Sequence, residues 1–450
     1  MKKFTVIAFF VIVSVIAVSN DCAQQSTEYD LILKGGHVID PSNNINGIRD
    51  IAVKDGKIVR VDKNIPSDEP KLTDMGYKKH FKVIDVSGYY VTPGLIDIHI
   101  HAYYTYKKDY GQMNYIIADD HCFNSCVTTC VDAGSSGAEN FEDFKEIIDS
   151  SRMRILAFLN IADGGMSFNA EQNPLQFNVK RAVETAKKYP EIIVGIKAAH
   201  YWRENEPYDD FHTPWANVDS AEAAGRLAEL PVMFDWFPRP PQGEWPERSY
   251  REFILEKMRP GDIHTHNYAR HIPIIMENGK LSPDVLNAQK KGIIFDVGHG
   301  GGSFVWRSAV PAIKHGYLPN SISTDLHRGS TNGTAINMIN VMSKFLCIGM
   351  SLEDVIRCST VNPALEINRP ELGTLSVGSP ADIAVIELLE GDFTYLDTSG
   401  GRLRGDKKLQ ATMTVFDGNV VFDPTGLSYP YWEDIPKESE YWVNNSGQYY

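Results

Sequence analysis

Eight short apolar segments, spaced roughly 30 to 40 residues apart, fill the middle of this 450-residue chain. Helix-like stretches separate several of them, for example residues 140–150 and 178–189. Strands that alternate with helices predict a parallel sheet covered by helices, and eight such units are what an α/β fold of the (β/α)8 TIM barrel type needs. An open, doubly wound sheet is the alternative, but no Gly-x-Gly-x-x-Gly motif follows the first segment. The segments begin at Leu95, Thr128, Ile155, Ile192, Pro231, Gly261, Gly292 and Ser321.

Both ends of the chain read as β structure. Short alternating runs joined by Asp-Gly pairs predict hairpins at Asp55-Gly56 and at Asp417-Gly418. We therefore expect a small β-sandwich domain built from both termini, next to the barrel. The predicted boundaries are a signal peptide at 1–22, the small β domain at 28–92 and 372–426, the barrel at 93–371 and a C-terminal extension at 427–450.

The composition bears on the kind of partner. Apolar residues make up 43% of the chain, which is ordinary for a soluble globular protein, and the formal net charge is −14 at pH 7. A nucleic-acid groove needs a basic face, so this acidity argues against a nucleic-acid partner. We expect a small-molecule partner; a homo-oligomer is compatible with the sequence, which does not indicate one.

The N-terminus predicts export. Lys2 and Lys3 precede the apolar run 4–18, and Ser19 follows it. A basic start, an apolar run of this length and a small residue are typical of a secretory signal, whereas a membrane span needs about 20 apolar residues. We expect a periplasmic or secreted protein with no membrane span after signal removal. A lipid anchor at Cys22 is the alternative.

Polar side chains stand where the predicted strands end. In a barrel of this kind, functional residues lie at the carboxyl ends of the strands. Two pairs of histidines, His99 with His101 and His264 with His266, are each two residues apart. This spacing lets both side chains of a pair face the same way on a strand. Such nitrogen and oxygen donors suit Zn²⁺ or a similar divalent cation. The candidates are His99, His101, Lys197, Asp235, His264, His266, Asp325 and His327.

Four sequence motifs resemble a known family. The stretch 91–101, Val-Thr-Pro-Gly-Leu-Ile-Asp-Ile-His-Ile-His, resembles the metal-binding start of the amidohydrolase superfamily. Residues 372–385 resemble the segment by which such chains re-enter the small β domain. Residues 296–304 and 323–327 resemble the dihydroorotase-like, deacetylase-type branch. The resemblance covers nearly all of residues 30–426.

This resemblance implies a role for each candidate ligand. His99 and His101 would bind the more buried metal, and His266 would bind a second one. Lys197 would be carboxylated and bridge the two, because an ammonium cannot bind a cation whereas a carbamate is an anion with two oxygens. Asp325 would bind the first metal and accept a proton from the attacking hydroxide. One or two Zn²⁺ ions are therefore implied.

The chain departs from the family pattern in two places. The branch usually has histidine at the end of the fifth strand, where this chain has Asp235. Asp235 can still bind the second metal; alternatively His264 supplies the missing nitrogen, or the enzyme binds a single metal. Relatives often have a basic residue two places after the lysine, where this chain has Ala199 followed by His200.

Several histidines are expected on the substrate side. By resemblance, His299 would be catalytic, holding or polarising a substrate carbonyl or carboxylate. His327 is expected beside the ligands, orienting a ligand or the substrate. His200 and His264 are further candidates for substrate contacts.

The predicted activity is hydrolysis of an amide C–N bond by metal-bound hydroxide. The substrate would be a small amide, either an N-acyl amino acid or a cyclic amide. Ester or lactone hydrolysis would use the same groups. A catalytically impaired, exported ligand-binding protein on the same scaffold is the alternative of another class, and Asp235 is its only support.

Overall fold

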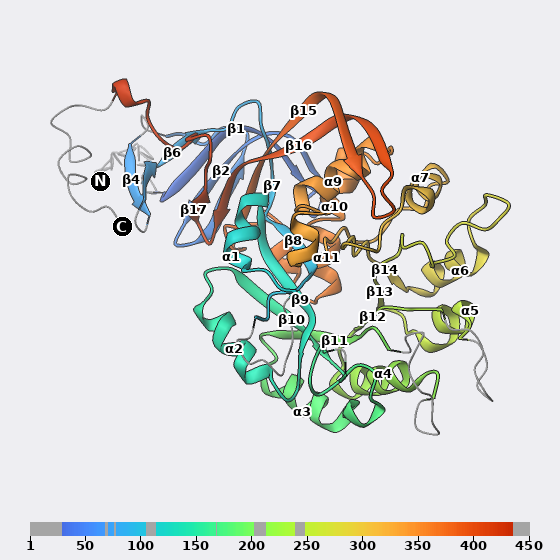
Figure 1. Ribbon diagram of the computed structural model, residues 1–450. Coiled ribbons are helices and arrows are strands. Elements are labelled where there is room, and N and C mark those ends of the chain that lie inside the picture. The colour runs from blue at the N-terminus through green and yellow to red at the C-terminus, as the bar shows by residue number, and fades with distance from the viewer. Residues whose placement is uncertain are drawn as a thin grey trace, which may run out of the picture.

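A computed structural model describes residues 29–67, 71–75, 78–104, 114–167, 169–201, 213–238 and 248–434. The predicted signal peptide, Cys22 and most of the C-terminal extension lie outside these ranges. Figure 1 shows two parts of the fold: a twisted sheet made from both ends of the chain, and a helix-covered barrel beside it. Among the described residues, no helix has the length and apolarity needed to cross a membrane.

The small domain combines strands from both termini, as the sequence predicts. One mixed sheet of eight strands runs in the order β17-β16-β15-β7-β1-β2-β3, with β6 also paired to β1. Both Asp-Gly pairs form tight turns with positive φ at each residue, which joins β2 to β3 and β16 to β17. The bounds are β1 (Leu31–Asp40), β2 (Ile45–Lys54), β3 (Lys57–Asp62), β6 (Val83–Asp85), β7 (Tyr90–Pro93), β15 (Ile383–Leu396), β16 (Arg402–Phe416) and β17 (Asn419–Phe422), with a separate hairpin of β4 (Leu72–Met75) and β5 (Lys78–Phe81).

The barrel contains seven parallel strands paired in sequence order, from β8 to β14. Ile96, Val131, Phe158 and Met233 are buried in one apolar cluster that also includes Ala364 of α11, which follows the barrel. The strands are β8 (Leu95–Ile100), β9 (Val127–Gly137), β10 (Arg154–Asn160), β11 (Ile193–Ala198), β12 (Val232–Phe234), β13 (Ile263–His264) and β14 (Ile294–Phe295). The helices are α1 (Ala118–His121), α2 (Phe141–Ser150), α3 (Val179–Lys188), α4 (Ala216–Ala228), α5 (Tyr250–Glu252), α6 (Pro283–Lys291), α7 (Trp306–Lys314), α8 (Arg328–Thr331), α9 (Met338–Cys347), α10 (Leu352–Arg357) and α11 (Val361–Glu366).

The eighth predicted segment closes the barrel without forming a full strand. It makes one parallel bridge from Ser321 to Asp296 and another from Leu326 to Ile100. The His101 N–H donates to the Leu326 carbonyl at 2.9 Å. Side-chain hydrogen bonds strengthen this short pairing, because Asp296 accepts from the Ser321 hydroxyl at 2.9 Å. The TIM-like barrel is therefore confirmed, with an irregular last segment.

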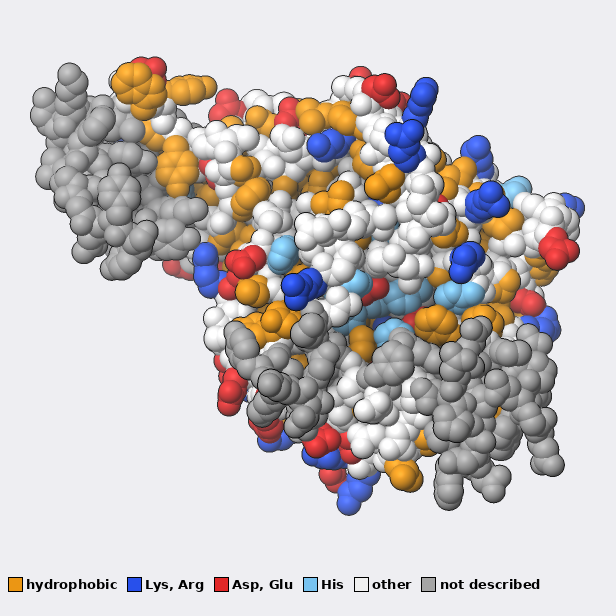
Figure 2. Space-filling view, viewed as in Figure 1, with side chains coloured by type: hydrophobic (Ala, Val, Ile, Leu, Met, Phe, Trp, Pro, Cys, Tyr) orange, Lys and Arg blue, Asp and Glu red, His pale blue; other side chains and the backbone are white. Residues whose placement is uncertain are grey.

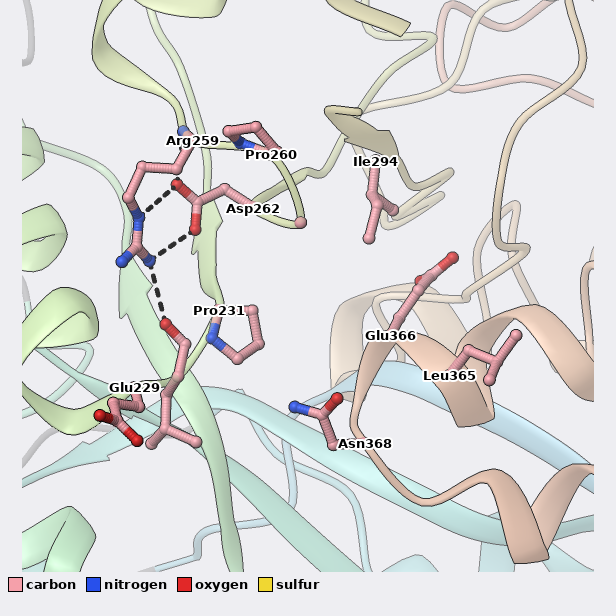
Figure 3. A pocket seen from close by; sticks show the side chains of 11 residues that line it. Glu229, Pro231, Arg259, Pro260, Asp262, Ile294, Leu365, Glu366 and Asn368 are labelled. Carbon is pink, nitrogen blue, oxygen red and sulfur yellow. Dashed lines mark hydrogen bonds and ion pairs between the residues drawn. The ribbon is translucent and has the colours of Figure 1, made fainter. Parts of the chain in front are cut away.

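The carboxyl ends of the barrel strands open on a hollow of the surface. Figure 2 shows histidine side chains gathered in this hollow. The opposite end of the strands carries a cavity of about 330 Å³. In Figure 3, Glu366 from α11 lies across this cavity from Arg259 and Asp262, which form an ion pair.

Glu366 makes the stability of this end sensitive to pH. The residue is only 8% exposed, and its Oε2 has no hydrogen-bond partner among the described residues. Burial, helped by the negative charge of Asp296, raises the pKa of Glu366 from its ordinary 4.5 to about 8. The folded state therefore holds a proton that the unfolded state releases above pH 4.5.

We expect Glu366→Gln to stabilise the protein increasingly as the pH rises from about 4.5 to about 8. Below that window both states of the wild type are protonated, so the variant gains nothing. Within it, the difference in unfolding free energy should grow by at most about 1.4 kcal/mol per pH unit. Denaturant unfolding at several pH values measures this. Glu371→Gln, at an exposed position, is the control. A difference that stays constant with pH would contradict the assignment.

Candidate metal centre

Three buried side chains converge at the carboxyl ends of the barrel strands. His99 lies in β8, His266 follows β13, and Asp325 lies in the closing eighth segment. One ligand atom from each lies within 4.8 Å of the others. Two imidazoles and a carboxylate this close together, and buried, are a donor set that suits a divalent cation.

Contacts behind the imidazoles fix which ring nitrogen faces the cluster. His266 places Nδ1 at 2.6 Å from the Gly298 carbonyl, which can only accept, so Nδ1 carries the proton. His99 places Nδ1 at 2.9 Å from the Thr265 hydroxyl, which itself donates to Asp296. That hydroxyl must accept from His99. Both rings therefore present the unprotonated Nε2 that metal binding requires.

His101 joins the cluster from the end of β8. Its Nε2 lies 3.1 Å from Asp325 Oδ1, and its Nδ1 lies 2.8 Å from the Ser135 hydroxyl. The His99 Nε2 lies 3.6 Å from the same Asp325 oxygen. Burial alone would raise the pKa of Asp325, but the neighbouring His99 and His101 hold it well below its ordinary value. Asp325 is therefore an anion at neutral pH.

Lys197 is a buried lysine close to the metal-binding cluster. Its side chain is 1% exposed, and its Nζ has no hydrogen-bond partner among the described residues. Burial lowers the pKa of Lys197, although the charges of Asp235 and Asp325 oppose this. A lowered pKa favours the unprotonated amine, which is the form that reacts with CO₂. A carbamate would place two anionic oxygens beside the histidines, so the residues present fit a metal centre.

Asp235 stands where β12 ends and is buried. Its Oδ2 lies 3.8 Å from His266 Nε2, and its Oδ1 has no hydrogen-bond partner among the described residues. Burial opposes ionisation, but His266, His200 and Lys197 together lower the pKa of Asp235. The structure thus brings this carboxylate to the cluster as an anion.

Left-handed backbone positions aim several of these side chains. His200, His266 and Asp325 have φ of 51°, 60° and 47°. Residues other than glycine rarely adopt this region, and each such position costs of order 1 kcal/mol or more. Three of them in one cluster indicate that the surrounding packing holds the side chains in place against local preference.

Two predicted residues are not brought to the cluster. The His264 ring packs 5.6 Å from the rings of Tyr250 and Phe253, in the layer between strand and helix. His299 is fully buried, with Nδ1 at 2.9 Å from the Gly300 carbonyl and Nε2 at 2.7 Å from Lys344 Nζ. In this arrangement both ring nitrogens of His299 contact protein groups.

His327 and His200 lie at the edge of the cluster. The His327 ring is 6.2 Å from the His101 ring, and its Nδ1 lies 2.9 Å from Asn114 Oδ1 and accepts from the Gly329 N–H. It caps the start of α8, which gives it a structural role at the mouth of the site. His200 follows β11, and its Nε2 lies 3.9 Å from Asp235 Oδ2.

Sequence reasoning missed the residues behind the ligands. Thr265, Ser135 and Asp296 fix the histidines, and Lys344 holds His299. One signal was available, because Lys344 is a lone charge within the apolar segment that forms α9. The others are ordinary polar residues whose contacts depend on how distant strands are arranged.

The match to known proteins agrees with this site. The model of the amidohydrolase family matches residues 306–421. A deacetylase of Brucella anthropi is 33% identical over 82% of this chain and 86% of its own length. A deacetylase of Agrobacterium fabrum is 34% identical over 70% of this chain and 75% of its own length. The chain therefore belongs to the amidohydrolase superfamily.

Solved structures share the architecture. An adenine deaminase superposes with a TM-score of 0.75 at 24% identity and covers 88% of this chain and all of its own. A dihydroorotase has a TM-score of 0.71 at 28% identity and covers 87% of this chain and 99% of its own. Barrel and small sheet thus form one recurring unit, as the sequence motifs predict.

We expect Gly134→Ala to damage the site through Lys197. A Cβ at Gly134 would lie 2.6 Å from Lys197 Cγ and 2.7 Å from its Cβ, and φ is +86°. The protein should lose about 1–3 kcal/mol of stability and release bound divalent metal more readily. Thermal unfolding and metal analysis after dialysis test this. Gly302→Ala, with open space around it, should change neither; normal metal retention in Gly134→Ala would contradict the role.

Proposed function

We propose that this amidohydrolase uses Zn²⁺ to hydrolyse the amide bond of a small N-acyl compound, such as an N-acyl amino acid. The observation that carries the proposal is the buried cluster of His99, His101, His266 and Asp325. Lys197 lies beside it, and its Nζ has no hydrogen-bond partner within the described part of the chain. The two deacetylase relatives support the substrate class. Cyclic amides are the second candidate, because a dihydroorotase shares the architecture at 28% identity.

We assign the ligands of each cation as the family resemblance implies, and the cluster of buried donors supports a metal site at this position. His99, His101 and Asp325 would hold one zinc ion, His266 would hold a second, and the carbamate of Lys197 would lie between them. Bound zinc lowers the pKa of water toward neutrality and polarises a carbonyl oxygen. The Gly298 carbonyl and the Thr265 hydroxyl keep the imidazoles aimed at this position throughout.

Asp325 is the group that moves the proton. It is anionic, only 8% exposed, and close to the histidine nitrogens. In the proposed reaction it accepts a proton from the attacking water and passes it to the leaving nitrogen. The water oxygen bonds to the carbonyl carbon and the C–N bond breaks, which releases a carboxylate and an amine. No serine or cysteine nucleophile takes part.

Chelation should abolish release of acetate from N-acetyl amino acids, and added Zn²⁺ should restore it. Asp325→Asn should lower kcat by about 10²–10⁴-fold, the range for loss of a positioned acid or base. The exposed carboxylate Asp392 offers the control Asp392→Asn, which should keep full activity. Full activity of metal-free protein would overturn the proposal. A protein that binds no metal and leaves Lys197 unmodified would favour the ligand-binding alternative.

A substrate panel separates the remaining reactions. N-acetyl amino acids should be hydrolysed at a higher kcat/KM than dihydroorotate, hydantoins or lactones. A preference for cyclic amides or for lactones would be consistent with the proposed metal-dependent hydrolysis but would contradict the proposed substrate class.

We also propose export, on the basic start, apolar run and small residue at 2–19. The mature protein should appear outside the cytoplasm and lack this segment, as mass spectrometry of the intact chain would show. Cytoplasmic protein of full mass would contradict this proposal.

A further inference from the structure

His200 stands beside Asp235 although the two come from different strands. It follows β11, three residues after Lys197, and its φ of 51° turns it out of the strand path. Its Nδ1 lies 3.0 Å from Glu171 Oε2, and its Nε2 lies 3.9 Å from Asp235 Oδ2. The ring is therefore tied to one carboxylate on one side and faces another with its second nitrogen.

Glu171 is built to hold this ring. It is 3% exposed, and its Oε1 accepts from the Asn160 amide at 3.0 Å. Asn160 ends β10, and its Nδ2 also donates to the Gly134 carbonyl. A carboxylate fixed in this way takes the proton on His200 Nδ1 and leaves the Nε2 lone pair directed at Asp235. The same arrangement, a carboxylate behind a histidine, orients metal ligands in many proteins.

The distances around Asp235 are close to those of neighbouring ligand atoms on one cation. Oδ2 lies 3.8 Å from His266 Nε2 and 3.9 Å from His200 Nε2, both too long for a hydrogen bond. Zinc bonds of about 2.0–2.2 Å in tetrahedral geometry place neighbouring ligand atoms about 3.3–3.6 Å apart. Each pair lies slightly beyond this spacing, so a bound cation would draw its two atoms together by a few tenths of an ångström.

We propose that His200, with Asp235 and His266, binds the second divalent cation, and that Glu171 positions His200. The inference rests on the metal centre of the proposed function. In this proposal His200, and not His264, supplies the nitrogen ligand, because His264 packs among aromatic rings away from the cluster. At the end of β12 this chain has Asp235 where a histidine ligand is usual. His200, which follows β11, would supply a nitrogen ligand in its place.

The second cation would be the more exchangeable of the two. The His200 side chain is 26% exposed, whereas His99 is 1% exposed and His101 8%. Solvent and chelators therefore reach the second position more readily than the first. The difference in affinity between the two cations can be measured without knowing the substrate.

The test counts metal ions and measures their affinity. The wild type, dialysed against Zn²⁺ or Co²⁺, should hold two ions per chain. His200→Asn should keep one ion and weaken the other at least tenfold. Glu171→Gln should weaken the same ion by about 10–100-fold, the range for loss of an orienting partner. The exposed His315 offers the control His315→Asn, which should hold two ions.

The absorption spectrum of the Co²⁺ protein provides the second readout. Loss of a nitrogen ligand should change the band of the second cobalt in His200→Asn and leave the first unchanged. Two ions bound with wild-type affinity and spectrum in His200→Asn would overturn the inference, as would a wild type that binds only one. Two ions that depend on His200, in a protein that hydrolyses no amide, would uphold it while the proposed function fails.

Discussion

Two buried carboxylates, Asp97 and Asp296, hold the barrel closed where its hydrogen-bonded ladder is weakest. Asp97 accepts from the backbone N–H and the hydroxyl of Thr324, and Asp296 accepts from Ser321 and Ser323. The closing segment makes only isolated bridges to its neighbours, so these side-chain bonds supply the missing pairing. Asp325 follows directly, and its position next to His101 depends on this closure.

Asp296 extends the same constraint to the imidazoles. It accepts from the Thr265 hydroxyl, which in turn accepts from His99, so one carboxylate aligns both the closing segment and a metal ligand. Removing it would free a hydroxyl, a ring and a backbone segment together. The candidate site is therefore a property of the closed barrel and not of its ligand residues alone.

Much of this could be predicted from the sequence, because the relevant signals are local. Alternating apolar segments and Asp-Gly turns gave the barrel and the two hairpins, and strand ends located His99, His101 and Asp325. The directions in which some side chains point could not be predicted from the sequence. The spacing predicts that His264 and His266 share a face, but the strand ends at His264 and His266 has φ of 60°, so the alternation does not continue between them. The resemblance predicts that His299 faces the substrate, and the fold adds a contact of 2.7 Å between its Nε2 and Lys344 Nζ that the sequence does not indicate.

The small sheet carries a consequence for how the chain acquires its structure. Val91 in β7 pairs with Val385 in β15, so the barrel lies in the chain between two strands that are neighbours in space. Closing a loop of that length costs conformational entropy before any contact repays it, which slows folding. During synthesis, β7 must wait for almost the whole barrel before its partner emerges. Its exposed edge would meanwhile be open to wrong pairing.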